Sequence, residues 1–205
     1  MSNLVKLPVQ IKTVHLISHR LDSFYPVIGG LSDKEVQKRI NSTIIRTVYA
    51  LMQEQGYFEN EATTVTASYE IKNNQRGILS LSLINYAFSG GAHGLTLIRS
   101  LTFNTETGRV YQLKDLFKPD ADYVLRLSEL VAEQIKERDI PILGEFTGIR
   151  PDQDFYIADK SLVLYFQLYE ITPYVYGFPY FPISIYDIQD IIDEEGPLGI
   201  MLGSF

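Results

Sequence analysis

Hydrophobic residues along this chain follow two periods, one typical of a long helix and the other of strands. Behind Ser32 they recur every three or four positions, which predicts one amphipathic helix over Ser32–Gln55. Ser32 and Glu35 have the spacing of a capping box, and Gly56 is a residue that commonly ends a helix. At ~1.5 Å per residue the helix is about 36 Å long. Only a broad sheet can bury its apolar stripe, which comprises Val36, Ile40, Ile44, Val48 and Leu51.

Strand-like patterns surround this helix. Val9–Ile17 alternates imperfectly, and Phe24–Ile28 runs into a Gly29-Gly30 turn. After the helix, Thr64–Ile71 alternates cleanly between apolar and polar positions, and Asn73–Gly77 has the composition of a hairpin turn. The pattern predicts an antiparallel meander with the long helix on one face, and its further strands are Ile78–Asn85, Leu95–Phe103 and Val110–Leu113.

The second half repeats helix and strand signals in a different order. A helix capped by Asp120 or Asp122 carries a buried stripe, followed by a hairpin whose Leu162–Leu168 strand is apolar on both faces and therefore central. The later predictions are a loop over Glu170–Pro182, a strand over Ile183–Tyr186, a short helix capped by Asp187, and a tail from Asp193 without packed structure. Helices between groups of antiparallel strands predict an α+β fold in two lobes, residues 1–112 and 113–205.

Candidate chemistry lies first in the glycine-rich stretch Tyr86–Gly94, which predicts a turn with positive φ or a close backbone approach. His93 is the histidine of this loop, and the free amides of Gly90 and Gly91 accompany it. One interpretation is a general base or a ligand-recognition group, with Glu170 as the carboxylate of a small hydrolase. The other is a histidine that hydrogen-bonds the backbone and closes the turn. Ser89 is close in the sequence but lacks the setting of a nucleophile.

Aromatic residues gather between Tyr165 and Tyr186. Tyrosine offers a rigid ring with a polar tip, so such a cluster can stack on a sugar or anchor a protein partner, or it can fill a core. Tyr174, Tyr176 and Tyr180 alternate through a proline-rich loop and are the predicted exposed platform.

Composition narrows the classes of function. A net charge of −7 disfavours nucleic acid and anionic membranes, and the absence of cysteine excludes disulfides and thiolate metal sites. His15 and His19 are four apart in a strand-like stretch, about 13 Å from each other, so no metal site or cofactor is predicted. The chain shows neither a signal peptide nor a membrane-spanning run, which predicts a cytoplasmic location, or an extracytoplasmic one if a leader has been removed.

Several motifs resemble a known pair of domains of unknown function. The first domain is represented by Tyr25-Pro26-Val27-Ile28 and the helix containing Val36–Ile40 and Asn41. The second is represented by Ser89–Gly94, Asn104-x-x-Thr107-Gly108, Leu113-x-Asp115-Leu116-Phe117, Phe155-Tyr156 and the stretch from Tyr165 to Gly177. The resemblance extends from about Thr13 to Ile192. The pair is found in the extracytoplasmic half of the lysozyme-sensing anti-sigma-V factor of bacilli and beside some peptidoglycan deacetylase domains.

This resemblance implies a non-enzymatic binding or sensing module with a protein or a cell-envelope glycan as its ligand. It implies no catalytic residues, since the deacetylase chemistry lies in a separate domain. The binding residues that we predict are Gly90, Gly91, His93, Tyr174, Tyr176 and Tyr180, around a groove between the two loops. A small hydrolase using His93 and Glu170, or a structural protein that assembles through its aromatic loop, are the alternatives.

Overall fold

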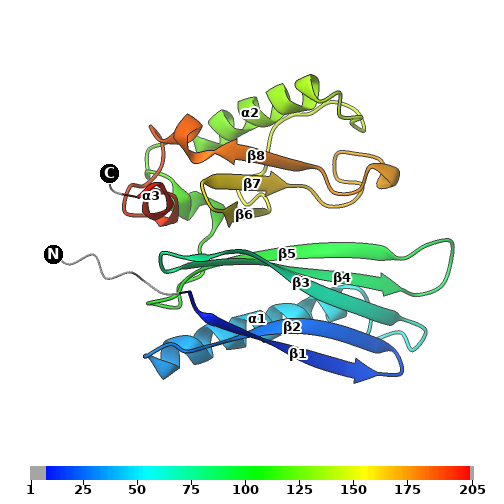
Figure 1. The fold of residues 1–205 in the computed structure, drawn as a ribbon. Coiled ribbons are helices and arrows are strands. Elements are labelled where there is room, and N and C mark those ends of the chain that lie inside the picture. The colour runs from blue at the N-terminus through cyan, green and yellow to red at the C-terminus, as the bar shows by residue number, and fades with distance from the viewer. Residues whose placement is uncertain (1–7, 204–205) are drawn as a thin grey trace. The chain divides into compact units, whose positions relative to one another are not determined.

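The computed structural model describes residues 8–203, and the chain divides into two compact units. The first ends at Val110 and the second begins at Tyr111. One five-stranded and one three-stranded sheet, each with a helix in its own unit, make up the fold (Figure 1). The α+β fold class predicted from the sequence is therefore confirmed.

The sheet of the first unit has the strand order β1-β2-β3-β4-β5. Its neighbouring strands are antiparallel except β2 and β3, which run parallel over only three residue pairs, from Leu21 with Val65 to Ser23 with Ala67. The strand β2 includes Phe24–Ile28, which the sequence pattern placed before a turn without assigning it to this sheet. The bounds are β1 Gln10–Ser18, β2 Leu21–Gly29, β3 Thr64–Gln75, β4 Ile78–Phe88 and β5 Leu95–Asn104.

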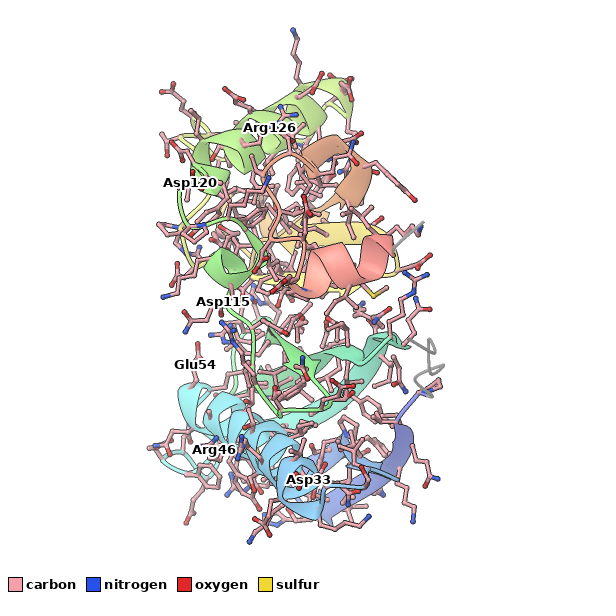
Figure 2. All side chains as sticks on the ribbon, turned by 90° about the vertical axis from the view of Figure 1, so that its left-hand side faces the viewer. Asp33, Arg46, Glu54, Asp115, Asp120 and Arg126 are labelled. Atoms are coloured by element: carbon pink, nitrogen blue, oxygen red, sulfur yellow. The ribbon has the colours of Figure 1, made fainter. Side chains whose placement is uncertain are left out.

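The helix α1 spans Lys34–Glu54 and packs on one face of this sheet (Figure 1). All five residues of the predicted apolar stripe are buried, together with Met52. The predicted capping box is wrong by one residue. Asp33, which lies at the start of the helix in Figure 2, accepts hydrogen bonds from the backbone N–H groups of Glu35 at 2.9 Å and Val36 at 3.1 Å. The negative charge of a carboxylate cap also interacts favourably with the positive end of the helix dipole, whereas a serine side chain carries no charge.

The β3–β4 hairpin is tighter than the sequence predicted. Its turn consists of Arg76 and Gly77, both with positive φ, and not of Asn73–Gly77. Asn73 is a buried strand residue at a register shift, and its amide donates to the Ile78 carbonyl at 2.7 Å. The amide therefore satisfies a strand carbonyl at the bulge, and Ile71, which lies just before the bulge, is 36% exposed.

The predicted strand Val110–Leu113 does not form. Val110 makes one isolated bridge with Phe103, and a 3₁₀ turn begins at Leu113 and ends at Leu116. The carboxylate of Asp115 accepts from the Gln112 backbone N–H at 2.8 Å, so the chain closes a local turn where the apolar pattern predicted pairing.

The second unit contains a sheet of order β6-β7-β8 and the helix α2, Tyr123–Glu137. The cap of α2 is Asp122, one of the two predicted residues, whose side chain accepts from the Leu125 N–H at 3.1 Å. Gln134 of α2 and Arg138, the residue that caps its C-terminus, donate to the carbonyls of Pro182 and Tyr180, so the helix covers the open edge of β8. The strand bounds are β6 Phe155–Ala158, β7 Ser161–Tyr165 and β8 Tyr180–Ser184.

β7 is central, as its apolar faces predicted, but it ends at Tyr165 and not at Leu168. The last strand is displaced from its predicted place: Ile183 lies inside β8, and Ile185–Ile188 is a 3₁₀ turn that contains Asp187. The acidic tail is also more ordered than predicted. It forms the helix α3, Pro197–Leu202, because Leu198 and Met201 are fully buried.

Candidate functional site

The glycine-rich loop joins β4 to β5, and its glycines serve two different needs. Gly90 and Gly91 have φ values of 93° and 102°, which disfavour any residue with a Cβ. Gly94 is needed for close approach, since a Cβ there would lie 2.4 Å from the Ala87 carbonyl oxygen. The predicted turn is confirmed in its backbone. The ligand-binding role proposed for Gly90 and Gly91 stays a prediction.

His93 is exposed, and its ring is held by the backbone beside it. The Nδ1 atom lies 2.9 Å from the carbonyl oxygen of Gly94, so Nδ1 carries the proton and donates. Ser89, the nearby hydroxyl, makes a 2.8 Å hydrogen bond with the buried side chain of Thr63. These two contacts fit a histidine that closes a turn and a serine that ties the loop to the start of β3.

Glu170, the carboxylate of the hydrolase alternative, already has local partners in the second unit. One oxygen accepts from the Gln167 backbone N–H at 2.7 Å, and the other pairs with the guanidinium of Arg150. A carboxylate held by an arginine and a backbone amide is stabilised as an anion and is a poor general base. The structure thus gives Glu170 the role of fixing the chain reversal after β7.

The three predicted platform tyrosines occupy different environments. Tyr174 and Tyr176 lie in the 3₁₀ turn η2, Tyr174–Tyr176, whereas Tyr180 is the first residue of β8. Tyr180 packs against the rings of Tyr156 and Tyr165, with centroid distances of 6.2 and 5.8 Å. Tyr180 is therefore part of a strand and a ring cluster, not of the predicted loop.

The turn η2 is closed by its own backbone. The N–H of Tyr176 donates to the Pro173 carbonyl at 2.9 Å, and the N–H of Gly177 donates to the Tyr174 carbonyl at 3.0 Å. Thr172, just before the turn, is fully buried and anchors it. Val175 at the apex is 93% exposed. A closed turn with an anchored base presents its apical side chains to solvent in a fixed geometry.

Tyr169 is a residue of this surface that the sequence reasoning did not single out. It has a φ of 66°, is 50% exposed, and its ring packs against that of Tyr174 in a tilted arrangement with a centroid distance of 5.4 Å. A non-glycine residue with positive φ is uncommon and often marks a functional or strained position. No local sequence signal predicts the positive φ of Tyr169. We call Tyr169, Tyr174, Val175 and Tyr176 the tyrosine surface.

The two units carry opposite charge. Residues 1–110 contain 11 Lys and Arg against 8 Asp and Glu, a net charge of +3. Residues 111–205 contain 7 against 17, a net charge of −10, and the two values together give the −7 of the whole chain. The tyrosine surface thus belongs to a strongly acidic unit, which attracts basic partners over a range set by the salt concentration.

Two further features bear on function within residues 8–203, namely metal-ligand clusters and membrane spans. That part of the chain holds no cluster of three or more His, Asp or Glu side chains arranged to bind a metal ion. His15 contacts Asp22 at 2.7 Å and stacks on Phe24 at 4.0 Å, so it is a surface residue of the β1–β2 hairpin. Over the same residues, no helix combines the length and apolar character that crossing a bilayer requires.

Two curated proteins of Bacillus subtilis are similar to this chain. The peptidoglycan-N-acetylmuramic acid deacetylase PdaC is 24% identical over 83% of this chain, and the anti-sigma-V factor RsiV is 28% identical over 85% of it. The chain spans 38% of the length of the deacetylase and 66% of that of the anti-sigma factor.

Solved structures share the fold. A DUF3298 family member from Bacteroides fragilis has a TM-score of 0.71 at 14% identity, covering 99% of this chain and all of its own. A DUF3298 family protein from Pseudomonas aeruginosa has a TM-score of 0.68 at 14% identity, covering 92% and 95%.

Two domain families match separate stretches of the sequence. The one described as deacetylase PdaC matches residues 18–96, and the protein family of unknown function DUF3298 matches residues 114–186. The resemblance predicted from the sequence motifs is thereby confirmed: the chain is similar to a PdaC domain followed by a DUF3298 domain.

Proposed function

We propose that this chain is a non-enzymatic binding or sensing module whose ligand is a protein or a cell-envelope glycan. Support comes from its similarity to an anti-sigma factor and to a peptidoglycan deacetylase, which are a regulator and an envelope enzyme by name. The local contacts of His93 and Glu170 offer no support for the hydrolase alternative. Of the two predicted locations, an envelope ligand fits the extracytoplasmic one.

The tyrosine surface is the contact that we assign to a protein partner. The observation that carries this assignment is the closed 3₁₀ turn, which exposes Val175 and Tyr176 beside the packed rings of Tyr169 and Tyr174. Aromatic side chains held in place before binding lose little conformational entropy in a complex, so they are effective anchors. The acidic charge of this unit favours a basic partner, with a faster association rate at low salt.

Lysozyme is the first protein to test, because the sequence resembles a lysozyme-sensing module and lysozyme is basic. Isothermal titration calorimetry would compare the parent chain with the double variant Val175→Ser/Tyr176→Ala. We expect the double variant to bind at least tenfold more weakly, roughly 1.4 kcal/mol. Soluble peptidoglycan fragments form the second arm of the same experiment.

The matched control is Leu125→Ala, which removes an apolar side chain that is 57% exposed on α2 of the same unit. It should leave the affinity unchanged. Circular dichroism would establish that all variants stay folded. Equal affinity of the double variant and the parent would contradict the proposal that the tyrosine surface contacts the partner. Binding of peptidoglycan fragments but not lysozyme would assign the ligand to the glycan class.

A further inference from the structure

A separate groove lies in the first unit, between the helix α1 and the strand β2. Its cavity volume is about 400 Å³, a size that falls within the range of small-ligand sites. One wall is formed by β2 and the other by a face of α1. The lining residues that carry the argument are Tyr25, Val27, Lys34, Gln37, Lys38 and Ser42.

The unused hydrogen-bonding capacity of this groove consists mainly of donors. Gln37 has its carbonyl oxygen committed to the Leu31 N–H at 3.3 Å, which leaves its NH₂ group. The side chain of Asn41 accepts from the Ile28 N–H at 2.8 Å and donates to the Ile28 carbonyl at 3.0 Å, so both its polar atoms already have partners. The ammonium of Lys38 and the hydroxyls of Tyr25 and Ser42 have no hydrogen-bond partner within residues 8–203. A donor-rich wall selects a ligand rich in acceptor oxygens.

Positive charge surrounds the groove without local compensation. Lys34 donates to the Leu31 carbonyl at 2.8 Å, and in residues 8–203 no carboxylate lies within 4 Å of its amine or that of Lys38. Lys12 of β1 is exposed and paired directly with Val27, so it shares that face of the hairpin. Neither of the acidic residues near the start of α1 lines the groove. Asp33 caps the helix, and Glu35 is not among the lining residues. An anion in the groove would meet Lys34 and Lys38, which line it, while Lys12 adds positive charge on the same face of the hairpin.

An aromatic patch continues the same helical face. Tyr49 lies one turn beyond Ile45, which also lines the groove, and its ring stacks on Phe58 with a centroid distance of 6.2 Å. Tyr49 is 47% exposed and Phe58 52%. Burial, together with the nearby Tyr49, raises the pKa of Tyr25, so its hydroxyl stays a neutral donor at neutral pH. Flat apolar rings beside hydrogen-bond donors suit a sugar, which has apolar ring faces and polar edges.

We propose that this groove is a binding site for a carboxylate-bearing saccharide. Its carboxylate would pair with Lys34 and Lys38, the sugar hydroxyls would accept from Gln37 and Ser42, and a ring face would stack on Tyr25. Neighbouring sugars would extend towards Tyr49 and Phe58. The site lies entirely in the first unit and does not depend on the tyrosine surface of the second.

The test is a titration of the full chain, labelled with ¹⁵N, followed by amide chemical shifts. N-acetylmuramic acid and N-acetylglucosamine form a matched ligand pair, because they share the sugar ring and acetamido group and differ by a lactyl carboxylate. We expect N-acetylmuramic acid to shift amides within residues 25–27 and 34–45, with a dissociation constant lower by about fivefold or more than that of N-acetylglucosamine, as for a solvent-screened charge contact. The difference should shrink as salt is raised.

The variant Lys34→Gln/Lys38→Gln should reduce the affinity for N-acetylmuramic acid by about fivefold or more. Its matched control, Lys114→Gln/Lys136→Gln, removes two exposed lysines of the second unit and should leave that affinity unchanged. Equal binding of both sugars, or no shifts in these residues, would overturn the proposal. D-lactate or hexaglutamate binding as tightly as N-acetylmuramic acid would also overturn it, because the site would then recognise a carboxylate without a sugar.

Discussion

The two units of this chain differ in the sign of their net charge and in the side chains that they expose. The first carries a net charge of +3 and a lysine-lined groove, whereas the second carries −10 and exposes tyrosines on a closed turn. The bulk value of −7 describes neither of them. The net charge of the whole chain predicts basic partners only. The net charges of the separate units predict an acidic ligand for the first unit and a basic partner for the second.

Two glycine-containing loops sharpen the same comparison. In the first unit, polar side chains of the loop around Gly94 bond to neighbouring parts of the chain, His93 to the Gly94 carbonyl and Ser89 to Thr63. In the second unit, the turn before Gly177 satisfies its backbone internally and leaves its side chains outside. Glycine content alone therefore indicates a special backbone, while the direction of the side chains decides whether a loop can bind.

The largest expected effect concerns the core of the first unit. Ile44 is fully buried on the face of α1 that packs on the sheet, so Ile44→Asp places an unpaired charge there and should lower the free energy of unfolding by about 4 kcal/mol or more. Val175→Asp, at a 93% exposed position of the second unit, should change it by about 0.5 kcal/mol or less. Urea denaturation followed by circular dichroism measures both. Similar values for the two variants would contradict the assigned burial.

The next effect separates the two needs for glycine in the β4–β5 loop. Gly94→Ala forces a Cβ against the Ala87 carbonyl and should cost about 2–3 kcal/mol. Gly91→Ala meets no neighbour within 4 Å and is strained only by its positive φ, at a cost of about 1 kcal/mol. Thermal unfolding of the two variants would compare them, and the reverse order would show that close approach is not what fixes Gly94.

A smaller effect tests the cap of α1. Asp33→Ala removes the acceptor for two backbone N–H groups and should destabilise the fold by about 1 kcal/mol. Ser32→Ala is the matched control, and it should cost at most a few tenths of a kcal/mol. Urea denaturation resolves this difference. A larger loss for Ser32→Ala would restore the capping box that the sequence predicted.

The smallest effect concerns His93. His93→Ala removes the hydrogen bond of an exposed ring to the Gly94 carbonyl and should lower the free energy of unfolding by about 0.5–1 kcal/mol. The measurement is again urea denaturation, with assays of glycan and ester hydrolysis run on the same samples. Activity in the parent chain that disappears in a stable His93→Ala variant would favour the hydrolase alternative.

Much of the fold could be predicted because its signals are local. The stripe of α1, the cap Asp122 and the central place of β7 all follow from periodicity and composition. The errors arise where tertiary contacts override a local pattern. Val110 lacks a strand partner beyond one bridge, and Leu198 and Met201 order a tail whose acidic sequence predicted none.

The candidate site was predicted less completely, for a related reason. Tyr174 and Tyr176 were found from composition, but the direction of a ring depends on backbone geometry that composition does not encode. Tyr180 was assigned to a loop although β8 begins at that residue, and Tyr169 was not selected from the aromatic cluster because its positive φ has no sequence signature. The α1–β2 groove escaped notice because its other wall is β2, and the sequence pattern did not predict that this strand lies beside the face of α1 that carries Lys34 and Lys38.

The most direct test of the central claim is a nuclear magnetic resonance map of lysozyme binding on the full ¹⁵N-labelled chain. Amides of residues 169–177 should shift or broaden on addition of lysozyme, those of residues 34–45 should not, and the effect should weaken as salt is raised. Perturbation confined to residues 34–45, or the absence of any perturbation together with the absence of heat in calorimetry, would contradict the assignment of the tyrosine surface to a basic protein partner.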